Sequence, residues 1–218
     1  MRTQVGAIVG IVGSLVIALG SIVTALAYTG TKGEPYSPLT HWVSELGQVG
    51  VSQLSSVFNL GLIVGGICFA VFITALGISR RTRLAWLYAP IGIAAGIAGS
   101  FVGIYPMNYL DQHGLAALTF FNLGWICVGL ASWDFVRRRE ASFPRWLAVI
   151  GALTVAAFIG FLTVLLPLLG GAGLGAPDVR PQTFWIVPTL EWAVVIGILV
   201  WTFATSVSWW RAERGARA

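Results

Sequence analysis

The chain has 218 residues, of which 57% are apolar and only 10% are charged, and its mean hydropathy is +0.85. Soluble domains carry about 25% charged residues, so this composition excludes a water-soluble globular protein and predicts an integral membrane protein. The net charge of +5 would favour a nucleic-acid partner in a soluble chain. Here the basic residues fall between apolar runs and indicate membrane topology instead.

Six apolar runs are long enough to cross a bilayer, since a helical span needs about 20 residues. Hydrocarbon offers no water to the backbone, so each run is expected to be a helix. The predicted fold class is all-α, a polytopic bundle in a single transmembrane domain over 1–218. Its six helices are expected at about 5–28, 52–78, 84–106, 114–136, 146–169 and 184–209.

The first run also fits a cleavable signal peptide that ends at Ala25–Ala27 and would leave five spans. An h-region usually has about 7–15 residues, and this longer run favours a retained helix.

The basic residues predict the orientation of the bundle. Eleven of the thirteen fall on one side of the spans, and only Lys32 and Arg180 fall on the other. We therefore predict a multi-pass protein of the cell membrane. The positive-inside rule places both of its termini on the cytoplasmic side. The outer side holds the loops 29–51, 107–113 and 170–183.

The first outer loop contains SPLTHWVSELGQ, which predicts a short amphipathic helix at the outer membrane surface. Ser37 can cap this helix and Gly47 can end it. Its apolar stripe would be Leu39, Trp42, Val43 and Leu46, and its polar stripe His41, Ser44, Glu45 and Gln48. A simple anchor for the loop explains the pattern equally well.

Three polar side chains interrupt the outer halves of the spans. Asn59 and Asn122 each lie in a copy of FNLG, in the second and fourth helices, and Glu191 lies in the sixth. At 1.5 Å per residue, all three lie roughly 10–12 Å below the outer surface. Lipid exposure would be costly, so we expect all three to meet inside the bundle. Structural hydrogen bonds between helices would explain buried asparagines as well as a binding site does. The repeated FNLG fits either an old duplication or chance.

The third helix carries Gly92, Gly96, Gly99 and Gly103, which predict one smooth face for close helix packing. Cys68 and Cys127 lie within apolar runs and are expected to be packing residues.

Titratable residues gather on the predicted outer side, where acid–base chemistry is conceivable. The catalytic candidates are His41, Glu45, Asp111, His113 and Glu191. The ligand-binding candidates are Asn59, Asn122, Glu191 and His113. The spacing matches no zinc motif, so we predict no metal and no cofactor. A Ser44–His113–Asp111 triad can be written down, but no nucleophile elbow supports it, and a tight polar turn explains the stretch around His113 as well.

The stretches SPLTHWVSELG, FNLGLIVGG and GIYPMN with a following HG resemble the prokaryotic six-helix membrane family known as domain of unknown function 998. The resemblance covers roughly 8–208 and is most specific at Ser44–Gly47, Asn59, Pro106, His113–Gly114 and Glu191. Tyr105 stands where phenylalanine is expected. The resemblance implies the architecture and no reaction. The first outer loop also distantly resembles Frag1/DRAM-like membrane proteins, some of which are linked to lipid remodelling.

Three functions fit these features. The first is binding of a lipid or hydrophobic ligand in a polar pocket that opens to the outer leaflet. The second is a lipid-modifying enzyme that uses His41, Asp111, His113 and Glu191. The third is a small transporter, which the expected lack of polar groups on the inner halves of the helices disfavours. We expect membrane lipids as partners and no nucleic acid, and a homo-oligomer remains open.

Overall fold

The computed structural model describes residues 2–170 and 183–215. Within them it has six α-helices, α1 (Arg2–Ala27), α2 (Ser55–Arg80), α3 (Arg83–Ile104), α4 (Leu110–Arg137), α5 (Trp146–Gly170) and α6 (Ile186–Gly215), and one 3-10 helix, η1 (Val43–Gly47). All six α-helices are long and apolar enough to cross a membrane. The predicted six-span, all-α architecture is confirmed. The third predicted outer loop, with Asp178 and Arg180, lies outside the described residues except at its ends.

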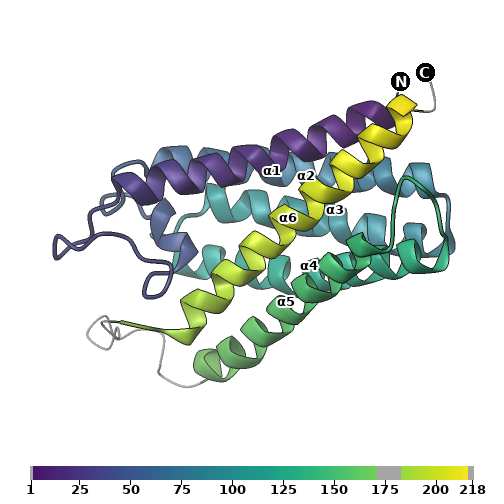
Figure 1. Cartoon of the computed structure of the whole chain (residues 1–218). Coiled ribbons are helices and arrows are strands. Elements are labelled where there is room, and N and C mark those ends of the chain that lie inside the picture. The colour runs from purple at the N-terminus through teal and green to yellow at the C-terminus, as the bar shows by residue number, and fades with distance from the viewer. Residues whose placement is uncertain (1, 171–182, 216–218) are drawn as a thin grey trace.

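The α-helices form a closed ring. Each packs against its neighbours in the sequence, and α6 packs against α1 (Figure 1). Helix α1 therefore begins, and α6 ends, at the same end of the bundle (Figure 1). We call it the arginine-rich end, because Arg81, Arg83 and Arg137–Arg139 lie in or beside its helix connections. The opposite end, which carries residues 28–54 and the α3–α4 connection, is called the loop end. The cytoplasmic placement of the arginine-rich end stays a prediction.

The outer surface of the ring is apolar. Leu26, Leu60, Leu115 and Leu153 are each between 60% and 84% exposed. In water such a surface would drive aggregation, but lipid tails are as apolar as leucine and solvate it.

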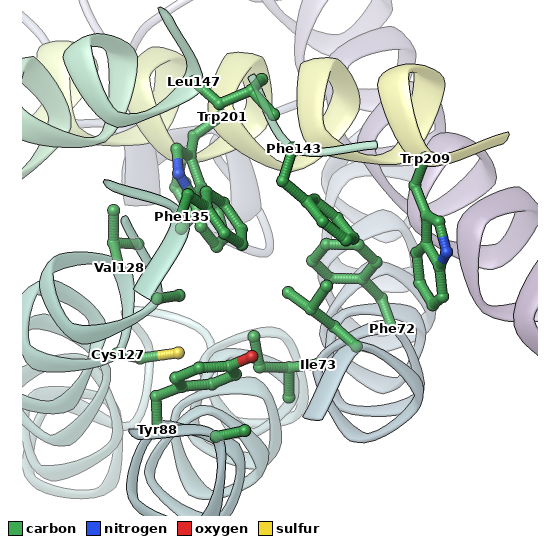
Figure 2. Packing of buried hydrophobic residues seen from close by; sticks show 14 of the residues in the cluster. Phe72, Ile73, Tyr88, Cys127, Val128, Phe135, Phe143, Leu147, Trp201 and Trp209 are labelled. Atoms are coloured by element: carbon green, nitrogen blue, oxygen red, sulfur yellow. The ribbon is translucent and has the colours of Figure 1, made fainter. Parts of the chain in front are cut away.

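A cluster of buried hydrophobic residues lies toward the arginine-rich end, where aromatic side chains from several elements meet (Figure 2). Phe135 stacks on Phe143 with 5.0 Å between ring centroids. The Trp201 indole N–H donates to the Ser132 hydroxyl at 3.1 Å, so the polar edge of this ring is also satisfied. Cys127 is buried in the same core, as expected of a packing residue.

Arg80 closes this core at the end of α2. Its Nε donates to Asp134 Oδ2 at 2.8 Å, and its Nη1 lies 2.7 Å from Glu140 Oε2. The guanidinium also lies 4.9 Å from the centre of the Phe143 ring. A cation buried this deeply persists because it is paired on several sides. The cluster joins α2, α4 and the α4–α5 connection.

Glycine allows α3 to approach α2 closely. A β-carbon at Gly96 would lie 2.7 Å from the Gly66 carbonyl oxygen, too close for any side chain. At Gly99 the nearest neighbours of such an atom are ring atoms of Phe120, 3.6 Å and more away. Gly99 follows Gly96 by three residues, which is less than one helical turn. It therefore points about 60° away from the side of α3 on which Gly96 lies. The predicted glycine face is therefore correct for Gly96, and also for Gly92 and Gly103, where an added β-carbon would collide with neighbouring helices, but it is wrong for Gly99.

This difference predicts opposite effects for two matched substitutions. Gly96→Ala should lower the thermal unfolding midpoint, because its methyl group forces two backbones apart. Gly99→Ala should raise it slightly, because replacing a helical glycine gains about 0.5–1 kcal/mol and the methyl group has room. Thermal unfolding of the two variants in the same detergent checks this. Midpoint shifts of the same sign and size would contradict the close approach at Gly96.

Candidate functional site

Residues 28–54, which we call the cap segment, cover the loop end of the ring. The predicted amphipathic helix over Ser37–Gly47 is reduced here to η1. His41 and Glu45, expected on its polar outer face, are buried, whereas Leu39, expected on its apolar face, is 46% exposed. The interfacial-helix prediction is thus corrected, because the polar side chains of this segment find their partners inside the protein.

Glu191, in the second turn of α6, anchors the cap segment. Its Oε2 accepts a hydrogen bond from the Val43 backbone N–H at 2.8 Å. The preceding N–H, of Trp42, donates to Glu45 Oε1 at 2.9 Å. The buried carboxyl groups of Glu45 and Glu191 therefore accept consecutive backbone N–H groups, which places them close together on the inner side of the cap segment. Glu191 faces the bundle interior, as expected from the sequence.

Tyr36 adds a second connection between the cap segment and α6. Its hydroxyl donates to the Trp42 carbonyl at 3.0 Å and accepts the Trp192 indole N–H at 2.8 Å. Burial raises the pKa of the Tyr36 hydroxyl above its usual value, and the nearby Glu191 acts in the same direction. The hydroxyl consequently stays protonated and remains a donor.

His41 is enclosed within the cap segment. The Ser37 backbone N–H donates to its Nδ1 at 3.2 Å, which leaves the proton of a neutral ring on Nε2. That Nε2 lies 3.9 Å from Glu34 Oε1. The ring also contacts Tyr28 and Tyr36, with centroid distances of 5.5 Å and 5.2 Å. These contacts give His41 a role in holding the cap segment together.

Two asparagines tie the cap segment to the helices beside it. Asn59 Nδ2 donates to the Gly47 carbonyl at 2.9 Å. Asn108, in the α3–α4 connection, both accepts from the Val49 N–H and donates to the Val49 carbonyl, at 2.9 Å and 3.0 Å. The Asn59 side chain therefore holds the cap segment against the first turns of α2.

Asn122 does not belong to this group. Helix α4 begins at Leu110 rather than at Gly114, so Asn122 lies deeper than expected. It is exposed on the outside of the bundle, and its Nδ2 donates to the Leu118 carbonyl of its own helix at 2.8 Å. The expectation that it faces the interior is wrong, because one turn of its own backbone satisfies the amide.

The repeated FNLG is explained by its other residues. Phe58 and Phe121 are both buried, and so are Gly61 and Gly124. In both copies the phenylalanine and the glycine lie on the buried side of the helix, while the asparagine has a different environment in each.

His113 and Asp111 do not form the triad written from the sequence. His113 Nδ1 lies 2.8 Å from the Tyr105 carbonyl oxygen, and since that oxygen only accepts, Nδ1 carries the proton. Asp111 is exposed one turn before the start of the buried part of α4. The Tyr105 carbonyl therefore already accepts the Nδ1 proton of His113 that Asp111 would accept in a triad.

A cavity of about 110 Å³ lies inside the ring, beneath the cap segment. By the same measure of volume, one water needs roughly 10–15 Å³. Helices α1 to α4 and α6 line the cavity, and Val43 and Ser44 cover one end, near Glu191 and His113. Along α6 it extends from Glu191 to Thr202, roughly 16 Å. Its lining is mostly apolar, whereas the sequence predicts a polar pocket, and Asn59 and Asn122 are not among its described lining residues.

Two hydroxyl groups in the cavity wall lack partners. Ser21 and Thr202 are 3% and 4% exposed, and neither side-chain oxygen has a hydrogen-bond partner among residues 2–170 and 183–215. An unpaired buried hydroxyl costs about 1–3 kcal/mol, so a molecule that bonds to it is stabilised. Thr202 also corrects the expectation that the inner halves of the helices lack polar groups. Others buried there are Ser132, Thr154, Thr205 and Ser206.

The Tyr36 contacts predict that its hydroxyl controls the mobility of the cap segment. Tyr36→Phe removes the bonds to Trp42 and Trp192 while leaving the ring. Amide hydrogen exchange across 37–47 should become faster, with little change in α2. Tyr109→Phe is the matched control, because Tyr109 is 56% exposed at the same end of the bundle. Unchanged exchange in Tyr36→Phe would mean that the other contacts suffice.

Comparison with known proteins gives one match. No curated protein and no solved structure matches the chain. The likeness of the first outer loop to Frag1/DRAM-like proteins stays a prediction. A family model described as "Protein of unknown function (DUF998)" matches residues 11–208, which include all of η1, α2 to α5 and most of α1 and α6. This six-helix membrane protein therefore belongs to the DUF998 family.

Proposed function

We propose that the protein binds a lipid or another hydrophobic molecule in the cavity beneath the cap segment. The observation that carries this proposal is the cavity itself, which combines a mostly apolar lining with the unpartnered hydroxyls of Ser21 and Thr202. Small-molecule sites commonly have such an apolar wall with a few placed polar groups.

The shape of the cavity supports a chain-like ligand. It extends along α6 from Glu191 to Thr202, with its titratable residues, Glu191 and His113, at the end below Val43 and Ser44. A molecule with an apolar chain and a polar head matches this distribution. The cap segment would then cover the head.

The catalytic candidates favour binding over chemistry. Of the five, only His113 and Glu191 line the cavity. His41 and Glu45 are engaged within the cap segment, and Asp111 is exposed. A lipid-modifying reaction would need a nucleophile and a base in contact. Ser44 and His113 both line this end of the cavity, but no hydrogen bond between described residues joins them.

Filling the cavity should remove the ligand. Gly99 lines the cavity, and a β-carbon there has room, so Gly99→Leu should fold and occupy the space with its side chain. Gly129→Leu is the matched control, because Gly129 lies outside the cavity and its nearest neighbour, Val155, is also 3.6 Å from the added carbon.

The measurement is native mass spectrometry of the protein released from nanodiscs, with the bound lipid quantified per protein. Wild type and Gly129→Leu should carry a bound molecule, and Gly99→Leu should lose it. Equal occupancy in all three proteins would overturn the proposal, because lipid held only on the outer surface would not respond to a side chain inside the ring.

A further inference from the structure

We infer that the molecule in the cavity presents a hydrogen-bond-donating head group, an amine or a hydroxyl, to Glu191, and that anionic head groups are excluded. This inference rests on the function proposed above and names the class of ligand. It starts from the groups at the end of the cavity beneath the cap segment.

The groups at this end are mainly acceptors. The Glu191 carboxyl group keeps free acceptor positions beside the one that the Val43 N–H occupies, and an amine bound there would also supply the cation that this buried group lacks among the described residues. His113 uses its Nδ1–H on the Tyr105 carbonyl, so Nε2 of the neutral ring is an acceptor as well. Both residues line the cavity. A head group that donates hydrogen bonds satisfies them, and one that only accepts does not.

The distribution of charge points the same way. Glu45 accepts the N–H next to the one that Glu191 accepts, so a second carboxylate lies close by. None of the described lining residues of the cavity is a lysine or an arginine. Among the described residues, Lys32 is the one Lys or Arg at the loop end, and it is exposed. A phosphate or carboxylate head group would enter this site without a compensating cation, which is strongly unfavourable away from water.

In a membrane, the head group of the ligand determines which molecule the cavity selects. An acyl chain gains little hydrophobic free energy when it moves from lipid tails into an apolar cavity, because both surroundings are apolar. Packing and hydrogen bonds must therefore supply the selectivity. The unpartnered hydroxyls of Ser21 and Thr202 lie along the cavity, and Glu191 and His113 mark its polar end.

The test compares three probes with the same chain, dodecylamine, dodecanol and dodecanoate, on the full-length protein in phosphatidylcholine nanodiscs. Native mass spectrometry at near-neutral pH and matched membrane content measures the occupancy of wild type against that of Gly99→Leu, which corrects for surface binding. Wild type should prefer the amine or the alcohol over dodecanoate by about tenfold, the value of one hydrogen bond to a charged group. Preference for the amine over the alcohol, or the reverse, identifies the head group, and either result supports the inference.

Glu191→Gln tests the residue directly. The amide oxygen still accepts the Val43 N–H, so the cap segment stays anchored, but an amide cannot become a carboxylate beside a bound donor. The preference over dodecanoate should fall by about tenfold. Glu213→Gln, at the arginine-rich end and outside the cavity, is the control and should keep the preference.

Two results separate the inference from the function beneath it. If dodecanoate binds wild type as tightly as the other probes, or if Glu191→Gln keeps the preference, the head-group inference is overturned while the binding function stands. If no probe binds wild type better than Gly99→Leu, the binding function itself fails.

Discussion

The hydrogen bond from the Val43 N–H to Glu191 holds the loop end of the protein together. A carboxyl group within a membrane span needs a hydrogen-bond partner, and no lysine or arginine among the described residues pairs with this one. The cap segment supplies the partner from its backbone. Because α6 also closes the ring against α1, this bond joins the cover of the cavity to the helix that completes its wall.

The two ends of the ring solve the same packing problem differently. A closed ring of six helices leaves space along its axis, and near the arginine-rich end the rings of Phe135, Phe143 and Trp201 fill it (Figure 2). Toward the loop end the lining includes Gly99 and Ser21, whose small side chains leave part of this space unfilled. In a bilayer the hydrophobic effect does not favour closing such a space, because the lipid outside is as apolar as the cavity wall. The cavity is therefore a direct result of residue size.

The fold was largely predictable from the sequence, and the site only in part. Span length and the cost of a buried charge were sufficient to find the six helices and the inward direction of Glu191. Asn122 was misplaced because the cost argument ignores the carbonyl of its own helix. In the cap segment, Val43 and Leu46 of the apolar stripe are buried as expected, but the polar stripe was placed wrongly. The amphipathic rule assumes water outside, whereas the partners of Glu45 lie inside. Ser21 gave no signal, because most serines in such helices bond to their own backbone, as Ser14 does.

Arg80 has a consequence for biogenesis. Its carboxylate partner, Asp134, is synthesised 54 residues later, near the far end of α4. Until α4 has entered the bilayer, an unpaired cation at the end of α2 is stable only in the headgroup region, where water and phosphate reach it. The placement of the end of α2 therefore depends on α4, which supplies the buried partner of Arg80. Helix α6 then completes the wall of the cavity, which α1 to α4 line on its other sides.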